Sequence, residues 1–463
     1  MLKNGAFVCV NVRTFVVGLG LQGCVRAAAV ALALMVFMSL PVQAVEDGVE
    51  SPCSEQALRA ALALVPSGGS LAVECVTDFT ITNPITVTDG ISLTISGSVQ
   101  VTSSGNRLFT VEPAAALTLR GLTLTGAKVS GDGGAINSAG RLMLDNVRLI
   151  DNSAARGGAV SIAAGAALTV TSSTFERNKA IVEGGALYLA GSANLTDTTW
   201  SANFAPNAGA IRVLPGARAT LDECLMRDGT SATAPALHNS GETNLLRCII
   251  TNMITADYGA VKADYGTVDN DGLLRVTNTI FLDNKSPDAN SLHNHTVTPV
   301  NLSRMELTYV TMLSRAQGGL GEVVNNGDLT MRNTVINSAG EFTCYQGEDV
   351  ADPPPSFDSL GGNVLSDRND LSDRGCFKVS ATPTDRFGSA PLSVATDSMG
   401  MLLVFPTTES PAIGGAACIE DVEFDLRLVL RGQDTTKGCD SGALETRPGE
   451  TFFRMYLPTI KHP

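Results

Sequence analysis

Aromatic, histidine and basic residues are scarce in this chain of 463 residues, and each shortage excludes a class of function. Aromatic residues make up 5% of the chain and Trp200 is the single tryptophan, so a row of aromatic platforms for sugar stacking is not expected. With 4 histidines and no Cys-x-x-Cys pair, a tetrahedral zinc site built on the cysteines is not expected. No apolar run after residue 44 is long enough to span a bilayer.

The first 44 residues have the features of an export signal. They contain basic residues but no acidic one before Glu46, an apolar run from Ala27 to Leu40, and a small-residue cleavage pattern at Val42–Ala44. Removing them leaves 29 of the 32 basic residues against 46 acidic ones, a net charge of −17. That balance argues against nucleic acid or anionic lipid as a partner. We expect a secreted or cell-surface protein that is monomeric and has no transmembrane span.

A block of apolar residues returns nine times in the same internal order. Successive blocks are 24 to 31 residues apart, and such a period is typical of a solenoid, in which each unit buries its apolar face by stacking on its neighbours. The central column is Leu119, Leu144, Val170, Leu195, Leu221, Leu245, Val276, Leu307 and Met331. A second apolar column follows five residues later, at Leu124, Leu149, Phe175, Trp200, Met226, Ile250, Phe281, Met312 and Ile336.

The repeated units are expected to be strands and not helices. Alternation such as Leu142-Met143-Leu144 is the period of a half-buried strand, and the surrounding Thr, Ser, Val and Ile favour strands. Glycine pairs such as Gly133-Gly134 mark corners. These features predict an all-β chain folded as a parallel β-helix of about ten coils. A leucine-rich horseshoe is the second interpretation, but its L-x-x-L-x-L-x-x-N signature is absent.

Asparagine recurs eight residues after the central column, at Asn152, Asn178, Asn203 and Asn284. At a spacing of about 4.8 Å per coil, stacked amides can hydrogen-bond to one another, and asparagine tolerates the left-handed backbone of a turn. We interpret this column as a structural ladder rather than a polar binding stripe. Trp200 lies in the second apolar column, which predicts that it fills the core.

Removal of the export signal leaves eight cysteines, and an even number in an exported chain predicts disulfides. One pair has geometric support, because Cys224 and Cys248 both lie three residues after the central column on consecutive coils. Their Cα atoms are then expected about 4.8 Å apart, which a disulfide accepts. Zinc is the competing interpretation. The expected neighbours in sequence are Cys53 with Cys75, Cys224 with Cys248, Cys344 with Cys376, and Cys418 with Cys439.

The export signal, the repeat and the cysteines together divide the chain into segments. Residues 1–44 are the export signal, 45–115 an N-terminal cap with the first coils, and 116–340 the regular coils. Residues 341–445 form an irregular C-terminal β region pinned by disulfides, and 446–463 a tail. A short helix from Ser54 to Leu64 is expected to cap the first coil, because an open β edge invites aggregation.

Several segments resemble known families. Gly133–Ile136 is similar to the GGAI repeats of polymorphic outer membrane proteins, and Phe175–Asn178 to their F-x-x-N motif. The wider chain resembles exported bacterial proteins of the choice-of-anchor Q type, in the pectin-lyase-like superfamily. The resemblance lies in an opening segment that contains Cys53 and Ala57–Ala60, and in the closing segment Cys439–Glu445. It implies a right-handed β-helix, as does the crossover rule for parallel strands, but no particular reaction.

The superfamily includes polysaccharide lyases and glycoside hydrolases, which need acidic calcium clusters or paired carboxylates. Asp269 and Asp271 lie in a D-x-D-G segment of a long coil; they are candidate calcium ligands, although we favour a simple turn. Asp367, Asp370 and Asp373 are a second calcium candidate, without the twelfth-position Glu of an EF-hand loop.

Two further groups of polar residues are considered. His293 and His295 are a candidate metal pair, but an exposed loop pair without a third ligand is expected to be polar surface. Asp421, Glu423 and Asp425 alternate along an expected strand near the end cap, where charges block edge pairing.

No coil supplies two convergent carboxylates, an arginine and a metal loop together. We therefore expect a non-catalytic protein that binds glycans or cell surfaces, without a cofactor unless it binds calcium. The alternative is a polysaccharide lyase or glycoside hydrolase acting on acidic polysaccharide. The long insertions at Asp257–Leu273 and Ser286–Asn301 are expected to be the binding loops. The two functions differ in whether acidic and basic side chains converge in one groove or scatter along the rod.

Overall fold

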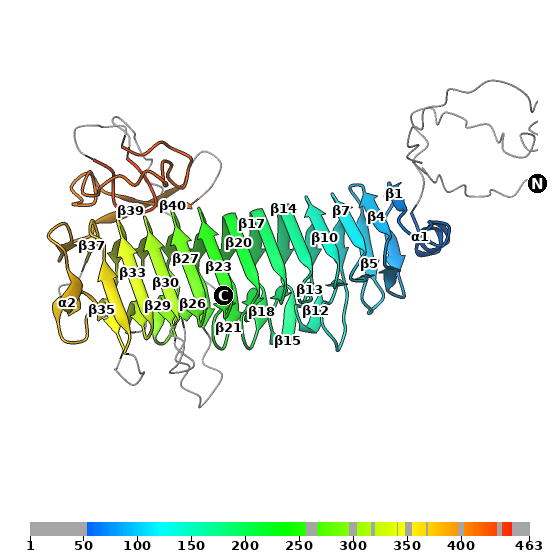
Figure 1. Cartoon of the computed structure of the whole chain (residues 1–463), viewed down its shortest axis with the longest axis horizontal. Coiled ribbons are helices and arrows are strands. Elements are labelled where there is room, and N and C mark those ends of the chain that lie inside the picture. Colours follow the sequence, from blue (N-terminus) through cyan, green and yellow to red (C-terminus); the bar gives the residue numbers. More distant parts are fainter. Residues whose placement is uncertain are drawn as a thin grey trace, which may run out of the picture.

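The computed structural model describes residues 53–255, 266–295, 303–315, 320–339, 341–347, 354–366, 369–396, 402–432 and 438–446. These residues wind into a rod of stacked coils, with helix α1 at one end and a lobe along one side (Figure 1). Strands of the rod pair in parallel with the equivalent strands of the coils before and after them. The chain is a right-handed parallel β-helix, as its repeat and its resemblance predict.

The largest sheet has 22 strands among the described residues and forms two adjacent faces of the rod. Three long strands run through both faces: β14 (Ala167–Glu176), β17 (Ser192–Ser201) and β20 (Arg218–Arg227). The first face also contains β1 (Ser70–Glu74), β4 (Ser92–Ser96), β7 (Ala116–Arg120), β10 (Arg141–Asp145), β23 (Glu242–Leu246), β27 (Leu273–Thr277), β30 (Arg304–Thr308), β33 (Asp328–Arg332) and β36 (Ser356–Ser359). The second face also contains β2 (Phe79–Ile81), β5 (Gln100–Ser103), β8 (Thr123–Thr125), β11 (Arg148–Ile150), β24 (Ile249–Thr251), β28 (Ile280–Leu282), β31 (Thr311–Leu313), β34 (Val335–Asn337), β37 (Val364–Leu365) and β38 (Arg386–Phe387).

The third face has 11 strands in the described residues, one for each of its coils, which agrees with the predicted size. A sheet of 5 short strands covers the corner between the second and third faces in the middle of the rod. The third face contains β3 (Ile85–Val87), β6 (Phe109–Val111), β9 (Ile136–Ser138), β13 (Val160–Ile162), β16 (Leu187–Leu189), β19 (Ile211–Val213), β22 (Leu237–Asn239), β26 (Gly266–Asn270), β29 (Ala289–Asn294), β32 (Gly321–Asn325) and β35 (Phe342–Gln346). The corner sheet contains β12 (Ser153–Arg156), β15 (Lys179–Glu183), β18 (Phe204–Ala205), β21 (Thr230–Ser231) and β25 (Ile254–Thr255).

The two predicted apolar columns form the core of the rod. The central column is in register from coil to coil, so that Leu119 pairs with Leu144, and the pairing continues to Met331. In the second column, the indole ring of Trp200 stacks on the ring of Phe175 with centroids 4.0 Å apart. Trp200 has no exposed surface, which confirms that it belongs to the core.

Two kinds of corner turn the chain between faces. A left-handed residue lies two positions after the central column, for example Asn146 with φ of 52° and Asn278 with φ of 49°. The glycine pairs form another corner, where the second glycine is required by close stacking of the backbones. A Cβ atom on Gly158 would lie 2.2 Å from the carbonyl oxygen of Gly185 on the next coil. Any larger residue at this corner would push the coils apart.

The asparagines after the central column form a ladder inside the turn that follows the second face. Asn152 Nδ2 donates to Asn178 Oδ1 at 3.1 Å, and Asn178 Nδ2 donates to Asn203 Oδ1 at 3.2 Å. Further along, Asn284 Oδ1 accepts the backbone amide of Met253 at 3.0 Å. All four asparagines are buried, so the column links coils and is not available as a surface stripe.

Both ends of the rod are covered. At the first end, α1 (Glu55–Leu62) begins at Ser54, whose Oγ accepts the amide of Ala57 at 3.1 Å, and Leu58 is buried against the core. At the other end lie the short helices η1 (Asn369–Leu371) and α2 (Phe377–Ser380). Among the described residues, no helix combines the length and apolarity that crossing a bilayer requires.

The disulfides of the described residues join the cysteines that are neighbours in sequence, as predicted. The Cys224–Cys248 bond connects consecutive coils with a Cα–Cα distance of 4.5 Å, close to the expected coil spacing. The Cα–Cα distances of the other bonds are 5.2 Å for Cys53–Cys75, 5.5 Å for Cys344–Cys376 and 5.1 Å for Cys418–Cys439.

After β38 the chain folds back and forms a lobe against the second face (Figure 1). The lobe begins with the antiparallel hairpin of β39 (Leu392–Thr396) and β40 (Leu402–Pro406) and includes the described residues up to 446. Ile280 and Leu313 on the outer side of the second face are buried against Leu403 and Phe405 of the lobe. The lobe therefore shares an apolar interface with the rod.

Arg431 and the closing segment Cys439–Glu445 hold the lobe in place. Arg431 Nη2 donates to Asn278 Oδ1 of the rod at 2.7 Å, and its guanidinium lies 3.7 Å from the ring centre of Tyr309. Arg431 Nη1 also lies 3.3 Å from Glu445 Oε2. The closing segment thus orients a buried arginine that connects the two parts of the chain.

Asp421, Glu423 and Asp425 do not share a strand face, contrary to the expectation from their alternation. They lie in an irregular segment of the lobe, where Asp421 is exposed and Asp425 is buried. The carboxylate of Asp425 accepts the backbone amides of Val429 at 2.9 Å and Glu445 at 3.0 Å. Asp425 therefore organises a turn, because its oxygens satisfy amides that have no strand partner.

Candidate functional site

A second asparagine ladder runs along the third face. Asn239 Nδ2 donates to Asn270 Oδ1, Asn270 Nδ2 to Asn294 Oδ1, and Asn294 Nδ2 to Asn325 Oδ1, each at 2.8 Å. These asparagines end the strands β22, β26, β29 and β32 and have no exposed surface. Because each one is bonded to the next, the ladder sets the register of the residues beside it.

Strand alternation places the neighbours of each ladder asparagine on the opposite side of the sheet from the core. The register pairs His238 with Asp269, and Asp269 with His293. Three of the 4 histidines in the chain are therefore brought beside two aspartates. We call this group the His–Asp cluster; it consists of His238, Asp269, Asp271, His293 and His295.

Short contacts join the members of the His–Asp cluster. His238 Nε2 lies 2.7 Å from Asp271 Oδ2 and 3.7 Å from Asp269 Oδ2. His293 Nδ1 lies 3.3 Å from Asp269 Oδ1, and His295 Nδ1 lies 3.1 Å from Asp271 Oδ1. The side chain of Asp269 is 0% exposed and that of His295 is 31% exposed. The cluster therefore extends from a buried carboxylate to the surface.

The carboxylate of Asp269 lacks hydrogen-bond partners. Neither of its oxygens has one among the described residues, although Asp269 has no exposed surface. His293 Nδ1 is near enough, but it is not oriented to donate and has no hydrogen-bond partner itself in the described part of the chain. An ionised carboxylate buried in this way costs several kcal/mol unless a positive charge lies beside it.

His238 has an oxygen acceptor at each of its ring nitrogens. Nδ1 lies 2.8 Å from Asn207 Oδ1, and Nε2 lies 2.7 Å from Asp271 Oδ2. A neutral imidazole carries one N–H and can donate to only one of these oxygens, and a cation at Nε2 would leave an N–H at Nδ1 to donate to Asn207. Burial raises the pKa of Asp271, but hydrogen bonds from His238 and His295 outweigh this effect and hold the pKa well below its usual range.

Polar contacts continue from the His–Asp cluster across the preceding coils. Ser240 Oγ donates to Asp271 Oδ2 at 3.1 Å, and Arg212 Nη1 donates to Ser240 Oγ at 2.8 Å. Arg212 Nε lies 3.1 Å from Glu183 Oε2. These side chains are partly exposed, so they form a continuous polar surface at the edge of the third face.

Arg156 extends this surface further. It forms a two-pronged pair with Asp132 at 2.8 and 2.7 Å, and its Nη1 donates to Tyr188 Oη at 3.4 Å. An open depression of about 420 Å³ lies here, lined in part by Asp132, Arg156, Val182 and Glu183. We call the whole surface the polar strip; it consists of the His–Asp cluster together with Asp132, Arg156, Glu183, Tyr188, Arg212 and Ser240.

The polar strip runs along the rod rather than around it. Register and bridge pairings connect Asp132 to Arg156, Tyr188 to Arg212, Arg212 to His238, and so on through the His–Asp cluster. At about 4.8 Å per coil, the strip is about 30 Å long. Acidic and basic side chains therefore converge on one side of the rod.

Of the other predicted calcium cluster, the two residues that the structure describes, Asp370 and Asp373, make separate contacts. Asp370 is buried, and its Oδ1 accepts the backbone amide of Cys344 at 3.0 Å. Asp373 is exposed and pairs with Lys378. Asp367 lies outside the described residues. Asp370 and Asp373 thus serve separate structural contacts, because Asp370 satisfies amides at the last strand of the third face.

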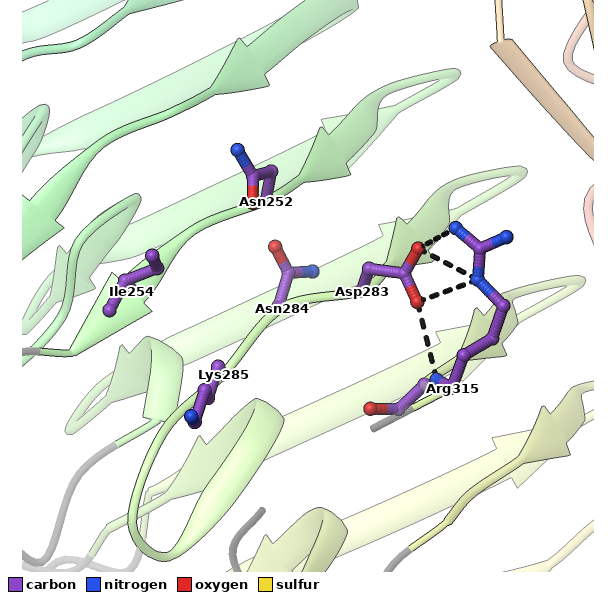
Figure 2. A pocket seen from close by; sticks show the side chains of 7 residues that line it. Asn252, Ile254, Asp283, Asn284, Lys285 and Arg315 are labelled. Atoms are coloured by element: carbon purple, nitrogen blue, oxygen red, sulfur yellow. Dashed lines mark hydrogen bonds and ion pairs between the residues drawn. The ribbon is translucent and has the colours of Figure 1, made fainter. Parts of the chain in front are cut away.

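A second depression, of about 320 Å³, lies near the corner between the second face and the corner sheet. Its charged groups satisfy each other: Asp283 accepts the backbone amide of Arg315 at 3.2 Å and its Nε at 3.0 Å (Figure 2). Asn284 on its floor belongs to the first ladder, and Lys285 stands apart from the ion pair (Figure 2). We assign no function to it.

The structure corrects the interpretation of two polar segments. Asp269 lies in β26 and not in a turn, and His293 is a buried residue of β29 and not exposed loop surface. The segments 257–273 and 286–301, expected to be binding loops, contain these two strands; residues 257–265 and 296–301 lie outside the described residues. The sequence does not predict these two strands, because His, Asp and Asn lack the alternation of apolar and polar residues by which a strand is recognised.

Sequence analysis also misses His238, which completes the site. The signal that identifies it is a repeated triplet with asparagine in the middle, each one coil after the last. These triplets are His238–Ser240, Asp269–Asp271 and His293–His295, whose asparagines are 31 and 24 residues apart.

Comparisons with known proteins concern the architecture. No protein-family model matches the chain, and no curated protein matches it. An alginate lyase from a Paenibacillus species is 15% identical with a TM-score of 0.35, covering 64% of this chain and 96% of the lyase. A pectate lyase is 14% identical with a TM-score of 0.38, covering 84% and 90%. An alginate lyase in complex with a trisaccharide is 10% identical with a TM-score of 0.40, covering 78% and 90%. At these values the likeness is one of architecture and carries no argument about activity.

Proposed function

We propose that this protein is an exported β-helix that binds an extended glycan along the polar strip. The observation that carries the proposal is the continuity of the strip, in which guanidinium donors and carboxylate acceptors alternate from Asp132 to His295. A sugar hydroxyl both donates and accepts hydrogen bonds, so it can bind beside either kind of group. A strip about 30 Å long accommodates several sugar units in a row.

Charge and covalent structure support this setting. The formal net charge of −14 disfavours nucleic acid, whose binding needs a basic surface. The disulfides, one of which joins neighbouring coils, suit an oxidising environment outside the cytoplasm. We place the chain with the exported proteins of the choice-of-anchor Q type, as a monomer at the cell surface or released from it. Its closing segment Cys439–Glu445 resembles theirs and here helps to hold the lobe on the rod.

A glycan array followed by calorimetry on the best ligand tests the proposal. Replacing Arg156 or Arg212 by alanine is expected to weaken binding at least tenfold, because each removes guanidinium donors from the strip. Arg218→Ala is the matched control, since Arg218 lies on the first face with its side chain 76% exposed. The proposal fails if no glycan binds, or if Arg218→Ala weakens binding as much as the strip variants do.

Cleavage of an acidic polysaccharide is the second candidate, because acidic and basic groups converge in the strip. Burial and the neighbouring charge of Glu183 raise the pKa of Tyr188, so the phenol stays protonated and can donate a hydrogen bond to a sugar oxygen. The hydrogen-bonded His238 and Asp271 lie two coils further along. Incubation with uronic-acid polymers, followed by assays for reducing ends and unsaturated products, separates cleavage from binding alone.

A further inference from the structure

The His–Asp cluster has the atoms and the spacing of a metal site. One ligand atom each from His238, Asp269 and Asp271 lies within 4.8 Å of the others. Ligands of a tetrahedral Zn²⁺ ion, with bonds of about 2.0 to 2.2 Å, lie about 3.3 Å from one another. The distance from Asp269 Oδ2 to His238 Nε2, 3.7 Å, is close to that value.

Two features of the cluster favour a cation at this place. The carboxylate of Asp269 is fully buried and has no hydrogen-bond partner among the described residues. His238 Nε2 faces two carboxylate oxygens while its Nδ1 already has Asn207 as a partner. A cation between these groups would neutralise the carboxylates and use the lone pair of Nε2.

We infer that the His–Asp cluster binds one divalent transition-metal ion, of which Zn²⁺ is the best match. His238 Nε2 and the carboxylates of Asp269 and Asp271 are the ligands. The 2.7 Å contact between His238 and Asp271 opens slightly as the ion replaces the hydrogen bond. Calcium, the metal considered from the sequence, fits less well because it prefers six to eight oxygen ligands.

The fold provides the support that such a site requires. The ligands alternate with Asn239, Asn270 and Asn294 along their strands, and the amide ladder holds these strands in register. His295, with a side chain 31% exposed, links the buried ligands to solvent. Asn207 orients His238 from the coil before. Rigid strands with hydrogen-bonded partners give more accurate ligand placement than loops do.

Metal titration of the mature chain without a polyhistidine tag tests this inference. After treatment with EDTA, Zn²⁺, Co²⁺ and Ca²⁺ are titrated separately by calorimetry, and the visible spectrum is recorded with Co²⁺. We expect one Zn²⁺ or Co²⁺ per chain, and the intense absorption of a low-coordinate cobalt site. The measurement needs no glycan, so its outcome is independent of the proposed function.

Variants assign the ligands. Asp269→Asn and His238→Gln are expected to weaken Zn²⁺ binding at least a hundredfold. Asp373→Asn and Asp421→Asn are the controls: each removes an exposed carboxylate outside the cluster and should leave Zn²⁺ binding unchanged. Circular dichroism of the metal-free variants verifies folding. If the Asp269 variant does not fold, Asp271→Asn and the cobalt spectrum of the unmodified chain decide the question. Binding that is equally tight in the ligand variants and the controls, or binding of Ca²⁺ but not Zn²⁺, overturns the inference.

Discussion

Glu322 makes the stability of the rod depend on pH. Its side chain is buried within the rod, where Ser291 Oγ donates to it at 2.6 Å and Asn290 Nδ2 at 3.1 Å. Burial raises the pKa of Glu322 from 4.5 to about 7, in opposition to these hydrogen bonds, which favour the charged form. The folded chain therefore keeps a proton that the unfolded chain loses between these two pH values.

The sign and size of the effect follow from proton linkage. Between pH 4.5 and about 7 the folded state binds more protons, so the free energy of unfolding falls as the pH rises. The rise in the pKa of Glu322 corresponds to about 3 kcal/mol in the free energy of unfolding. This contribution is fully present below pH 4.5 and is lost above about pH 7. Glu322→Gln mimics the protonated side chain at every pH, so this fall should disappear.

Urea unfolding with the disulfides intact, at pH 5 and pH 8, measures the difference for both proteins. Hydrogen exchange of the amides in β29 and β32 provides a local measure, since a solenoid opens in parts. Glu242→Gln is the control: hydrogen bonds from Arg218 and Arg275 lower the pKa of Glu242, so its titration lies below this pH window. If Glu322→Gln loses as much stability between pH 5 and pH 8 as the unmodified chain, the reasoning is refuted.

Three other variants test the packing. Replacing both Cys224 and Cys248 by alanine opens a loop with a sequence separation of 24 and should lower the free energy of unfolding by about 3 kcal/mol; an unchanged urea midpoint would contradict this. Asn270→Ala interrupts the second ladder and leaves buried amides unpaired, at a cost of about 1 to 3 kcal/mol for each group, measured in the same way. Arg431→Met leaves Glu445 buried without its partner and should destabilise the lobe by about 3 to 5 kcal/mol. Limited proteolysis should then cut the lobe first, and an equal cutting rate in both proteins would show that Arg431 does not hold it.

The regular part of the fold is predictable because it depends on local alternation repeated at the coil period. Leu119 and Leu144 can be aligned from the sequence, and the structure pairs them in register. The position of Trp200 in a column predicts its burial, and the positions of Cys224 and Cys248 predict their bond. Each of these predictions requires only that equivalent positions in successive coils be aligned. It does not require knowledge of how the chain turns at the corners.

The candidate site is harder to predict because its strands are polar. His238 and Asp269 are 31 residues apart in sequence, and their convergence depends on where each coil turns onto the third face. The lobe is less predictable still. Arg431 and Asn278 meet across 153 residues, and no periodicity relates two such positions.

The direction of the hydrogen bonds in the rod has a mechanical consequence. In a stack of parallel coils these bonds point along the rod, so a force that pulls its ends apart acts on a few bonds at a time and peels coils from an end. The disulfides Cys53–Cys75 and Cys344–Cys376 lie near the two ends of the rod, where peeling starts. Each prevents the segment that it encloses from extending under load. The chain is thus covalently reinforced where a pulled rod is weakest.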